Sequence, residues 1–78
     1  MIFERVAPIL AEHFNVPEED ISEEMTFEEL GADEIDLIDL ATILEDEFDI
    51  EIHEDEIKDI ETVEDLVSLI RTAVELSA

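Results

Sequence analysis

Residues 33–48 read DEIDLIDLATILEDEF, and this stretch decides the fold. Asp33 is a favourable N-cap residue, and Asp36, three positions later, has the spacing of a capping box. At about 100° per residue the apolar side chains fall within one narrow arc: Leu37, Leu40, Ala41, Leu44 and Phe48. The stretch therefore predicts an amphipathic helix centred on Leu37, with a break in the pattern at Asp49 to Glu51.

The outer side of this predicted helix carries apolar residues as well. With Leu37 at the centre of the buried stripe, the opposite side holds Ile35, Ile38 and Thr42, with carboxylates around them at Asp39, Glu45 and Asp46. Single exposed isoleucines are common and need no explanation. Two of them within an acidic rim instead favour a docking surface for a partner with a basic, apolar-centred patch.

Three more helices are expected. Apolar residues recur at helical spacing from about Ile2 to Phe14, and the inward positions are Ile2, Val6, Ile9, Leu10 and Phe14. Pro8 predicts a kink or a frayed first turn, and Val16-Pro17 closes the helix. A short helix is expected from His53 to Asp59, with Ile57 inward. Thr62 and Asp65 can cap the last helix, whose inward stripe is Val63, Leu66, Val67, Ile70 and Val74.

Residues 18–32 lack helical periodicity. Isolated apolar residues predict a long surface loop anchored to the core at four points, namely Ile21, Met25, Phe27 and Leu30, and Gly31 ends it. A loop of about fifteen residues in a small domain is often functional. We therefore expect an all-α fold, a single domain over residues 1–78: a four-helix bundle of three longer helices and one short helix, with a long first loop.

The composition excludes several functions. Twenty-six acidic against three basic residues give a net charge of −23, which would repel nucleic acid and anionic membranes. With 46% hydrophobic residues the chain can still build a core. It has no cysteine, so no disulfide or thiolate site is possible. Neither a signal peptide nor a membrane-spanning segment is expected, which favours the cytoplasm.

Catalytic and metal sites are not indicated. His13 and His53 have no second histidine at helical spacing, whereas a zinc site needs three or four converging ligands. No segment has the spacing of an EF-hand loop, and no serine has an activating base nearby in sequence. We therefore expect no enzyme activity and no specific metal site, only loose cation binding by the acidic surface.

Two segments, Leu30-Gly31-Ala32-Asp33-Glu34-Ile35-Asp36 and Leu44-Glu45-Asp46-Glu47-Phe48, together resemble the acyl carrier protein signature. The similarity continues through Glu51-Ile52, Ile60-Glu61-Thr62-Val63 and the flanking helices. The resemblance implies a four-helix bundle that carries acyl chains as thioesters on a 4'-phosphopantetheine arm. It also implies that the second helix is presented to basic patches on synthases and transferases.

One position departs from the family pattern. The family attaches its arm to the serine of Asp-Ser-Leu, whereas here Glu34 and Ile35 follow Asp33. A carboxylate cannot form the stable phosphodiester that this attachment requires, so no cofactor is expected on this chain. Ser22, Ser68 and Ser77 lie elsewhere in the chain. An engineered carrier, a homologue without the arm, and a decoy or regulator of carrier-binding enzymes all remain possible explanations of Glu34.

The hypothesis is a non-catalytic, monomeric docking domain of fatty-acid or polyketide biosynthesis, with Glu34 at the attachment position. Docking is assigned to seven residues of the second helix: Ile35, Asp36, Ile38, Asp39, Thr42, Glu45 and Asp46. The alternatives are a standalone acidic interaction protein, either a nucleic-acid mimic or a regulator of carrier-dependent enzymes, and a divalent-cation buffer.

Overall fold

The computed structural model describes residues 1–77; Ala78, the last residue of the predicted domain, lies outside them. Within residues 1–77 the elements are α1 (Ile2–Phe14), a 3-10 turn η1 (Glu18–Asp20), α2 (Glu34–Phe48), α3 (Glu54–Lys58) and α4 (Val63–Ser77). Three long helices and one short helix confirm the predicted fold class. In the described part of the chain, no helix combines the length and apolarity needed to cross a membrane.

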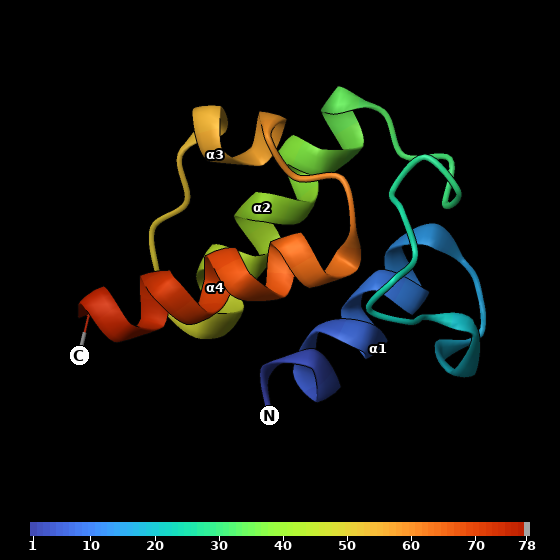
Figure 1. The fold of residues 1–78 in the computed structure, drawn as a ribbon, viewed down its shortest axis with the longest axis horizontal. Helices are drawn as coiled ribbons and strands as arrows, with labels where there is room; N and C mark the ends of the chain where they lie inside the picture. The colour runs from blue at the N-terminus through green and yellow to red at the C-terminus, as the bar shows by residue number, and fades with distance from the viewer. Residues whose placement is uncertain (78) are drawn as a thin grey trace.

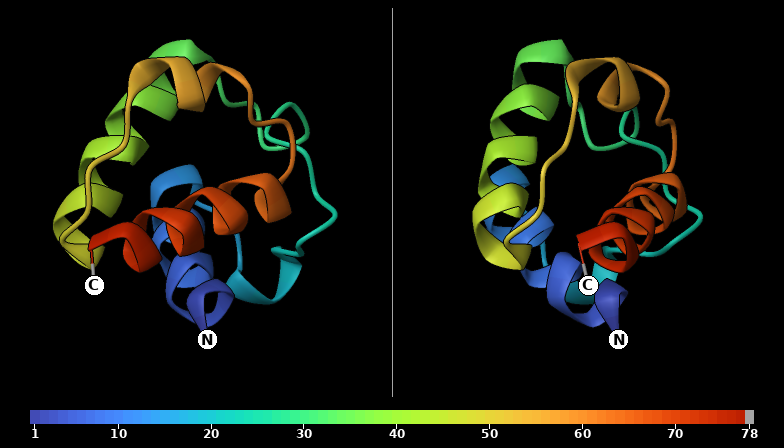
Figure 2. Two further views of the ribbon diagram at one scale, coloured as in Figure 1. Left: turned by 60° about the vertical axis from the view of Figure 1, so that its left-hand side comes forward. Right: turned by 90° about the vertical axis from the view of Figure 1, so that its left-hand side faces the viewer.

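Helix α2 spans the molecule. Its first turn lies beside α3, and its last turn lies near α1 and α4 (Figures 1 and 2). Helix α1 packs against α4, and α2 packs against α3. The long connection between α1 and α2 lies on the side away from the C-terminal end of α4 (Figure 1). This arrangement leaves one side of α2 open to solvent along its whole length.

The core is built from the predicted apolar stripes. Its buried residues come from every helix, from the long connection and, in the case of Ile52, from the segment between α2 and α3: Val6, Ala7, Leu10, Ile21, Phe27, Leu40, Ala41, Leu44, Ile52, Ile57, Val63, Leu66, Val67 and Ile70. Two of the four predicted loop anchors, Ile21 and Phe27, are buried, while Met25 and Leu30 pack partly buried against the core. On α2 the fully buried residues are Leu40, Ala41 and Leu44, whereas Leu37, the predicted centre of the stripe, is only partly buried.

Helix α1 begins and ends near the predicted residues. It runs from Ile2 through Pro8 without interruption, so the expected frayed first turn is not present. Pro8 and Glu4, the residue whose carbonyl loses its helical hydrogen bond, are both exposed. Asn15 ends the helix in the left-handed region at φ 56°, a conformation that asparagine tolerates.

The connection from residue 18 to residue 32 is more ordered than predicted. Besides η1, it pairs with the start of α4 through an isolated bridge between Thr26 and Thr62. The Val63 and Glu64 N–H groups donate to the carbonyls of Met25 and Glu23, both at 2.9 Å. The first N–H groups of a helix lack partners within it, so these two bonds complete the N-terminus of α4.

A capping box also fixes the start of α4. The Thr62 Oγ1 accepts the Asp65 N–H at 3.1 Å, and the Asp65 carboxylate accepts the N–H groups of Glu61 and Thr62 at 3.0 and 3.2 Å. These hydrogen bonds stabilise the charged carboxylate and therefore lower the pKa of Asp65. The bond from the Glu61 N–H has the largest effect, and the bond from the Thr62 N–H has the second largest. The predicted pairing of Thr62 with Asp65 is confirmed.

Arg5 joins α1 to the end of α2. Its Nη2 lies 3.0 Å from the Glu47 carboxylate and donates to the Glu47 carbonyl at 3.1 Å. The guanidinium also lies 4.3 Å from the centroid of the Phe48 ring. These contacts place a cation at the negative end of the α2 dipole and hold α2 at a fixed position against α1.

Candidate functional site

The candidate site begins at the N-terminus of α2, which a reciprocal capping box fixes. The Asp36 N–H donates to Asp33 Oδ1 at 2.8 Å, and the Asp33 N–H donates to Asp36 Oδ2 at 3.2 Å. His13 Nε2 of α1 approaches the other Asp36 oxygen at 3.9 Å. The first turn of α2 is therefore held in place from both sides before any partner is present.

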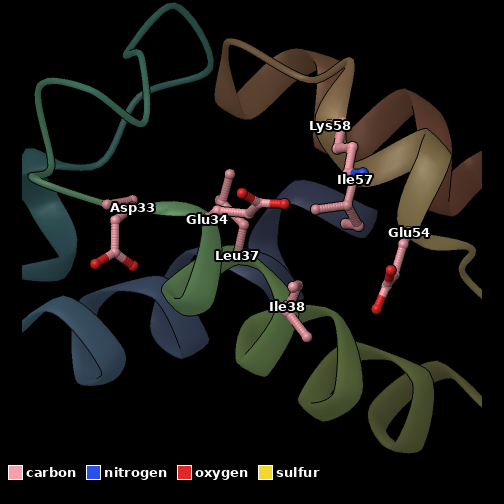
Figure 3. Close-up of a pocket in the computed structure, with 8 residues that line it drawn as sticks. Asp33, Glu34, Leu37, Ile38, Glu54, Ile57 and Lys58 are labelled. Carbon is pink, nitrogen blue, oxygen red and sulfur yellow. The ribbon is translucent and has the colours of Figure 1, made fainter.

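Glu34, which the family resemblance assigns to the attachment position, is the first residue of α2. Its side chain is exposed and points toward α3, whereas the neighbouring Asp33 side chain points away from α3 (Figure 3). A carboxylate at this end of a helix is favoured by about 0.3–1 kcal/mol through the helix dipole. Glu34 is thus compatible with the fold and presents a negative charge where the resemblance expects a hydroxyl.

A hollow of about 500 Å³ adjoins Glu34 between α2 and α3. Leu37, Ile38 and Ile57 form its apolar walls, and Glu34, Glu54 and Lys58 lie at its edges (Figure 3). The buried Ile57 closes the bottom of the hollow, because α3 packs against α2 there. The structure therefore places an apolar recess directly beside the residue that the sequence singled out.

The outward face of α2 carries four exposed residues of the predicted docking set: Ile35, Asp39, Thr42 and Asp46. Ile35 is 69% exposed although it is a large apolar residue in a long helix. Asp39 and Asp46 lie one and three turns further along the same side. The structure thus brings these predicted residues together on one face.

Ile38 does not point straight outward as predicted. It is partly buried and faces α3, where it lines the hollow beside Glu34 and a smaller hollow next to Ile52. The sequence could not reveal this, because the position of α3 over α2 depends on the path of residues 49–53. Ile38 thus lies at the edge of the exposed face of α2.

Two predicted docking carboxylates also have structural roles. Glu45 is partly buried and its Oε2 accepts the Ile52 N–H at 3.0 Å, which ties the connection after α2 back to the helix. Asp36 completes the capping box described above. Asp39 and Asp46 are therefore the two carboxylates of the predicted docking set whose side chains take part in no described hydrogen bond or ion pair.

The sequence reasoning missed Ile43, which is 42% exposed on the side of α2 that faces α1. It lines a second hollow, of about 530 Å³, together with Ile9, Glu12, His13 and Glu47. It also missed Glu54 and Lys58, which lie across from Glu34. If the buried arc of α2 is centred on Leu40 and Leu44 instead of Leu37, the helical period places Ile43 at the edge of that arc.

No metal centre is found among residues 1–77, since no three His, Asp or Glu residues converge there in a way that could hold an ion. His13 is partly buried with its ring edge-on to Phe14, at 4.9 Å between centroids, and His53 is exposed. The Thr42 hydroxyl donates to the Ile38 carbonyl at 3.3 Å.

Solved structures with the same fold include acyl carrier domains. The chain is 33% identical to an acyl carrier protein from Thermotoga maritima over 100% of this chain and 96% of that one, with a TM-score of 0.77. It is 30% identical to a chain in the structure of the ishigamide ketosynthase/chain length factor, with 94% and 93% covered and a TM-score of 0.74. The HMG-ACPI domain of the CurA module from Lyngbya majuscula shares the fold, with a TM-score of 0.80 at 20% identity and with 99% and 79% covered.

The sequence itself carries the family pattern. Residues 4–70 match the family described as phosphopantetheine attachment site, so the match includes α2, α3 and most of α1 and α4. Together with the 33% identity over the whole length of the chain, this match decides the family. The chain belongs to the acyl carrier proteins, the domains of the phosphopantetheine attachment site family.

Proposed function

We propose that residues 1–78 act as one docking domain in fatty-acid or polyketide biosynthesis, recognised by partner enzymes through α2. Family members are carriers and the chain is not an enzyme, so its role depends on being bound. The observation that carries the proposal is the outward face of α2, where the 69% exposed Ile35 lies among the exposed carboxylates of Asp39 and Asp46. Such a surface suits synthases and transferases with basic, apolar-centred patches.

The seven docking residues contribute in different ways. Ile35, Asp39, Thr42 and Asp46 are exposed and can contact a partner directly. Ile38 adds apolar surface from the edge of the hollow between α2 and α3. Asp36 and Glu45 add charge while they hold the two ends of α2 in place. The carboxylates steer and orient the encounter, and the isoleucines supply contact energy.

The residues at the attachment position do not fit a covalently bound phosphopantetheine arm. Transfer of the arm requires a hydroxyl oxygen that attacks the pyrophosphate of coenzyme A, and Glu34 offers only a carboxylate there. Ser22 lies in the long connection and Ser68 lies on α4, away from the start of α2. In this proposal the domain therefore stays unmodified and acts in the cytoplasm as a monomer whose partner-binding surface remains complete.

Intact-mass spectrometry tests the attachment assignment. The chain and its Glu34→Ser variant are incubated with a phosphopantetheinyl transferase and coenzyme A under identical conditions. We expect the mass of the serine variant alone to increase by one arm. An increase in the unchanged chain would contradict the proposal, and no increase in either would show that position 34 is not read as an attachment site.

A second candidate function, an acidic mimic of nucleic acid, is favoured by the net charge of −23 and by acidic residues in every element. A nucleic-acid mimic needs negative charge distributed over its surface and does not need an exposed apolar side chain. Ile35, however, is exposed within the acidic face of α2. Pull-down with the full chain separates the two. Recovery of nucleases or polymerases without any synthase would favour the mimic.

A further inference from the structure

The side of α2 that faces α1 carries a second apolar feature. Ile43 is 42% exposed and lines, with Ile9 of α1, a hollow of about 530 Å³. The other lining residues are Glu12, His13 and Glu47. The hollow beside Glu34 lies between α2 and α3, whereas this one lies between α2 and α1, so the two adjoin different flanks of α2.

Ile43 and Ile35 belong to one surface ridge. Residues four apart in a helix form a continuous row, and Ile35, Asp39 and Ile43 are such a row, which runs from the open side of α2 toward the flank that faces α1. At 1.5 Å per residue the row extends about 12 Å, with an isoleucine at each end and a carboxylate in the middle. All three side chains are exposed, so the row offers an apolar contact point at each end and a charge between them.

The charges around the second hollow are predominantly negative. Glu12 and Glu47 line it, while Arg5 pairs with Glu47 and His13 lies 3.9 Å from Asp36. Asp39 lies at the ridge between the two flanks, where no described side chain pairs with it. A partner surface that reaches this hollow must therefore combine an apolar side chain with basic groups.

We propose that the docking surface extends across α2 to Ile43, so that a partner enzyme contacts both flanks of the helix. One apolar group of the partner packs on Ile35, a second enters the hollow between Ile43 and Ile9, and basic groups between them face Asp39. This inference rests on the proposed docking function and adds a second anchor to it. It also assigns to α1 a part in recognition, through Ile9 and Glu12.

Binding of the full-length chain to the ishigamide ketosynthase/chain length factor tests the inference by titration calorimetry. Ile43→Ala should weaken binding about three- to tenfold, because it removes about half of an isoleucine's contact area from the interface. Leu76→Ala is the matched control, since Leu76 is 82% exposed on α4 and lines neither the hollow beside Glu34 nor the hollow beside Ile43. Glu12→Lys should weaken binding as well, and Glu75→Lys, with the same change in net charge, should not.

The outcomes distinguish the extension to Ile43 from the docking function on which it rests. If Ile35→Ala weakens binding while Ile43→Ala and Glu12→Lys leave it unchanged, docking through α2 stands and the extension to Ile43 is wrong. If the unchanged chain does not bind at all, the docking function itself fails and the extension fails with it. Circular dichroism of each variant verifies the fold, and alanine preserves the helix.

Discussion

Reversal of two charges on α2 tests the docking face most sharply. Asp39→Lys combined with Asp46→Lys changes two exposed residues that are seven positions apart, about 10 Å along the same side of the helix. No described hydrogen bond or ion pair involves either side chain, so the fold should tolerate the change. The net charge moves from −23 to −19, since each reversal adds two positive charges.

The expected loss of affinity follows from the exposure of these residues. A solvent-exposed ion pair is worth about 0.2–1 kcal/mol, and reversal replaces each attraction by a repulsion of similar size. Two reversals should therefore cost about 0.8–4 kcal/mol of binding free energy, or about a 4- to 900-fold increase in Kd. The loss of affinity should appear mainly as a lower association rate, because charges at the rim of an interface mainly affect how fast two proteins associate.

The assay is calorimetric or fluorescence titration against a carrier-dependent ketosynthase. The control is Glu18→Lys with Glu19→Lys in η1, which produces the same net charge on exposed residues outside α2. At high ionic strength the difference should shrink, because the Debye length falls from about 10 Å at 0.1 M salt to about 3 Å at 1 M. Equal losses in the two double variants would refute a defined docking face, because net charge alone would then explain binding.

Three further predictions concern stability. Arg5→Gln should lower the free energy of unfolding by about 0.5–1.5 kcal/mol, since it removes the exposed ion pair with Glu47 and the contact with Phe48. Urea titration measures this change, and an unchanged midpoint would contradict a stabilising role of Arg5. Asp65→Asn should destabilise the chain at pH 7. Because the folded pKa of Asp65 lies below its ordinary value of 3.8, the wild-type advantage is complete above that value and disappears as the pH falls through the folded pKa; a constant difference from pH 7 to pH 2 would show that the cap is not responsible. Sodium chloride, magnesium chloride and mildly acidic pH should each raise Tm, because the net charge of −23 repels itself, and melting curves insensitive to all three would refute that reasoning.

The helices could be predicted because their signals are local. Asp33 and Asp36 at the start of α2, and Thr62 and Asp65 at the start of α4, form the capping boxes that their spacing predicts. Apolar periodicity identified which face of each helix is buried. These features depend on residues within one or two turns of each other, so the sequence alone contains them.

The remaining errors come from contacts between distant segments. The connection before α2 pairs with the start of α4 through Thr26 and Thr62, 36 positions apart, and no periodicity indicates such a bridge. Ile38 turned out to face α3, and Ile43 lies at the side of α1, because both depend on how neighbouring helices pack on α2. The exposed surface of α2 was therefore predictable from its sequence, but the surroundings of Ile38 and Ile43 at its two edges were not.

Mapping of the interface by NMR tests the central claim most directly. Two-dimensional spectra of the 15N-labelled, unmodified chain are recorded with and without a carrier-dependent ketosynthase. The account predicts selective loss of intensity at Ile35, Asp39, Thr42 and Asp46, with the signals of α4 changed far less. Loss concentrated on α4, or spectra unaltered by excess ketosynthase, would contradict recognition through α2.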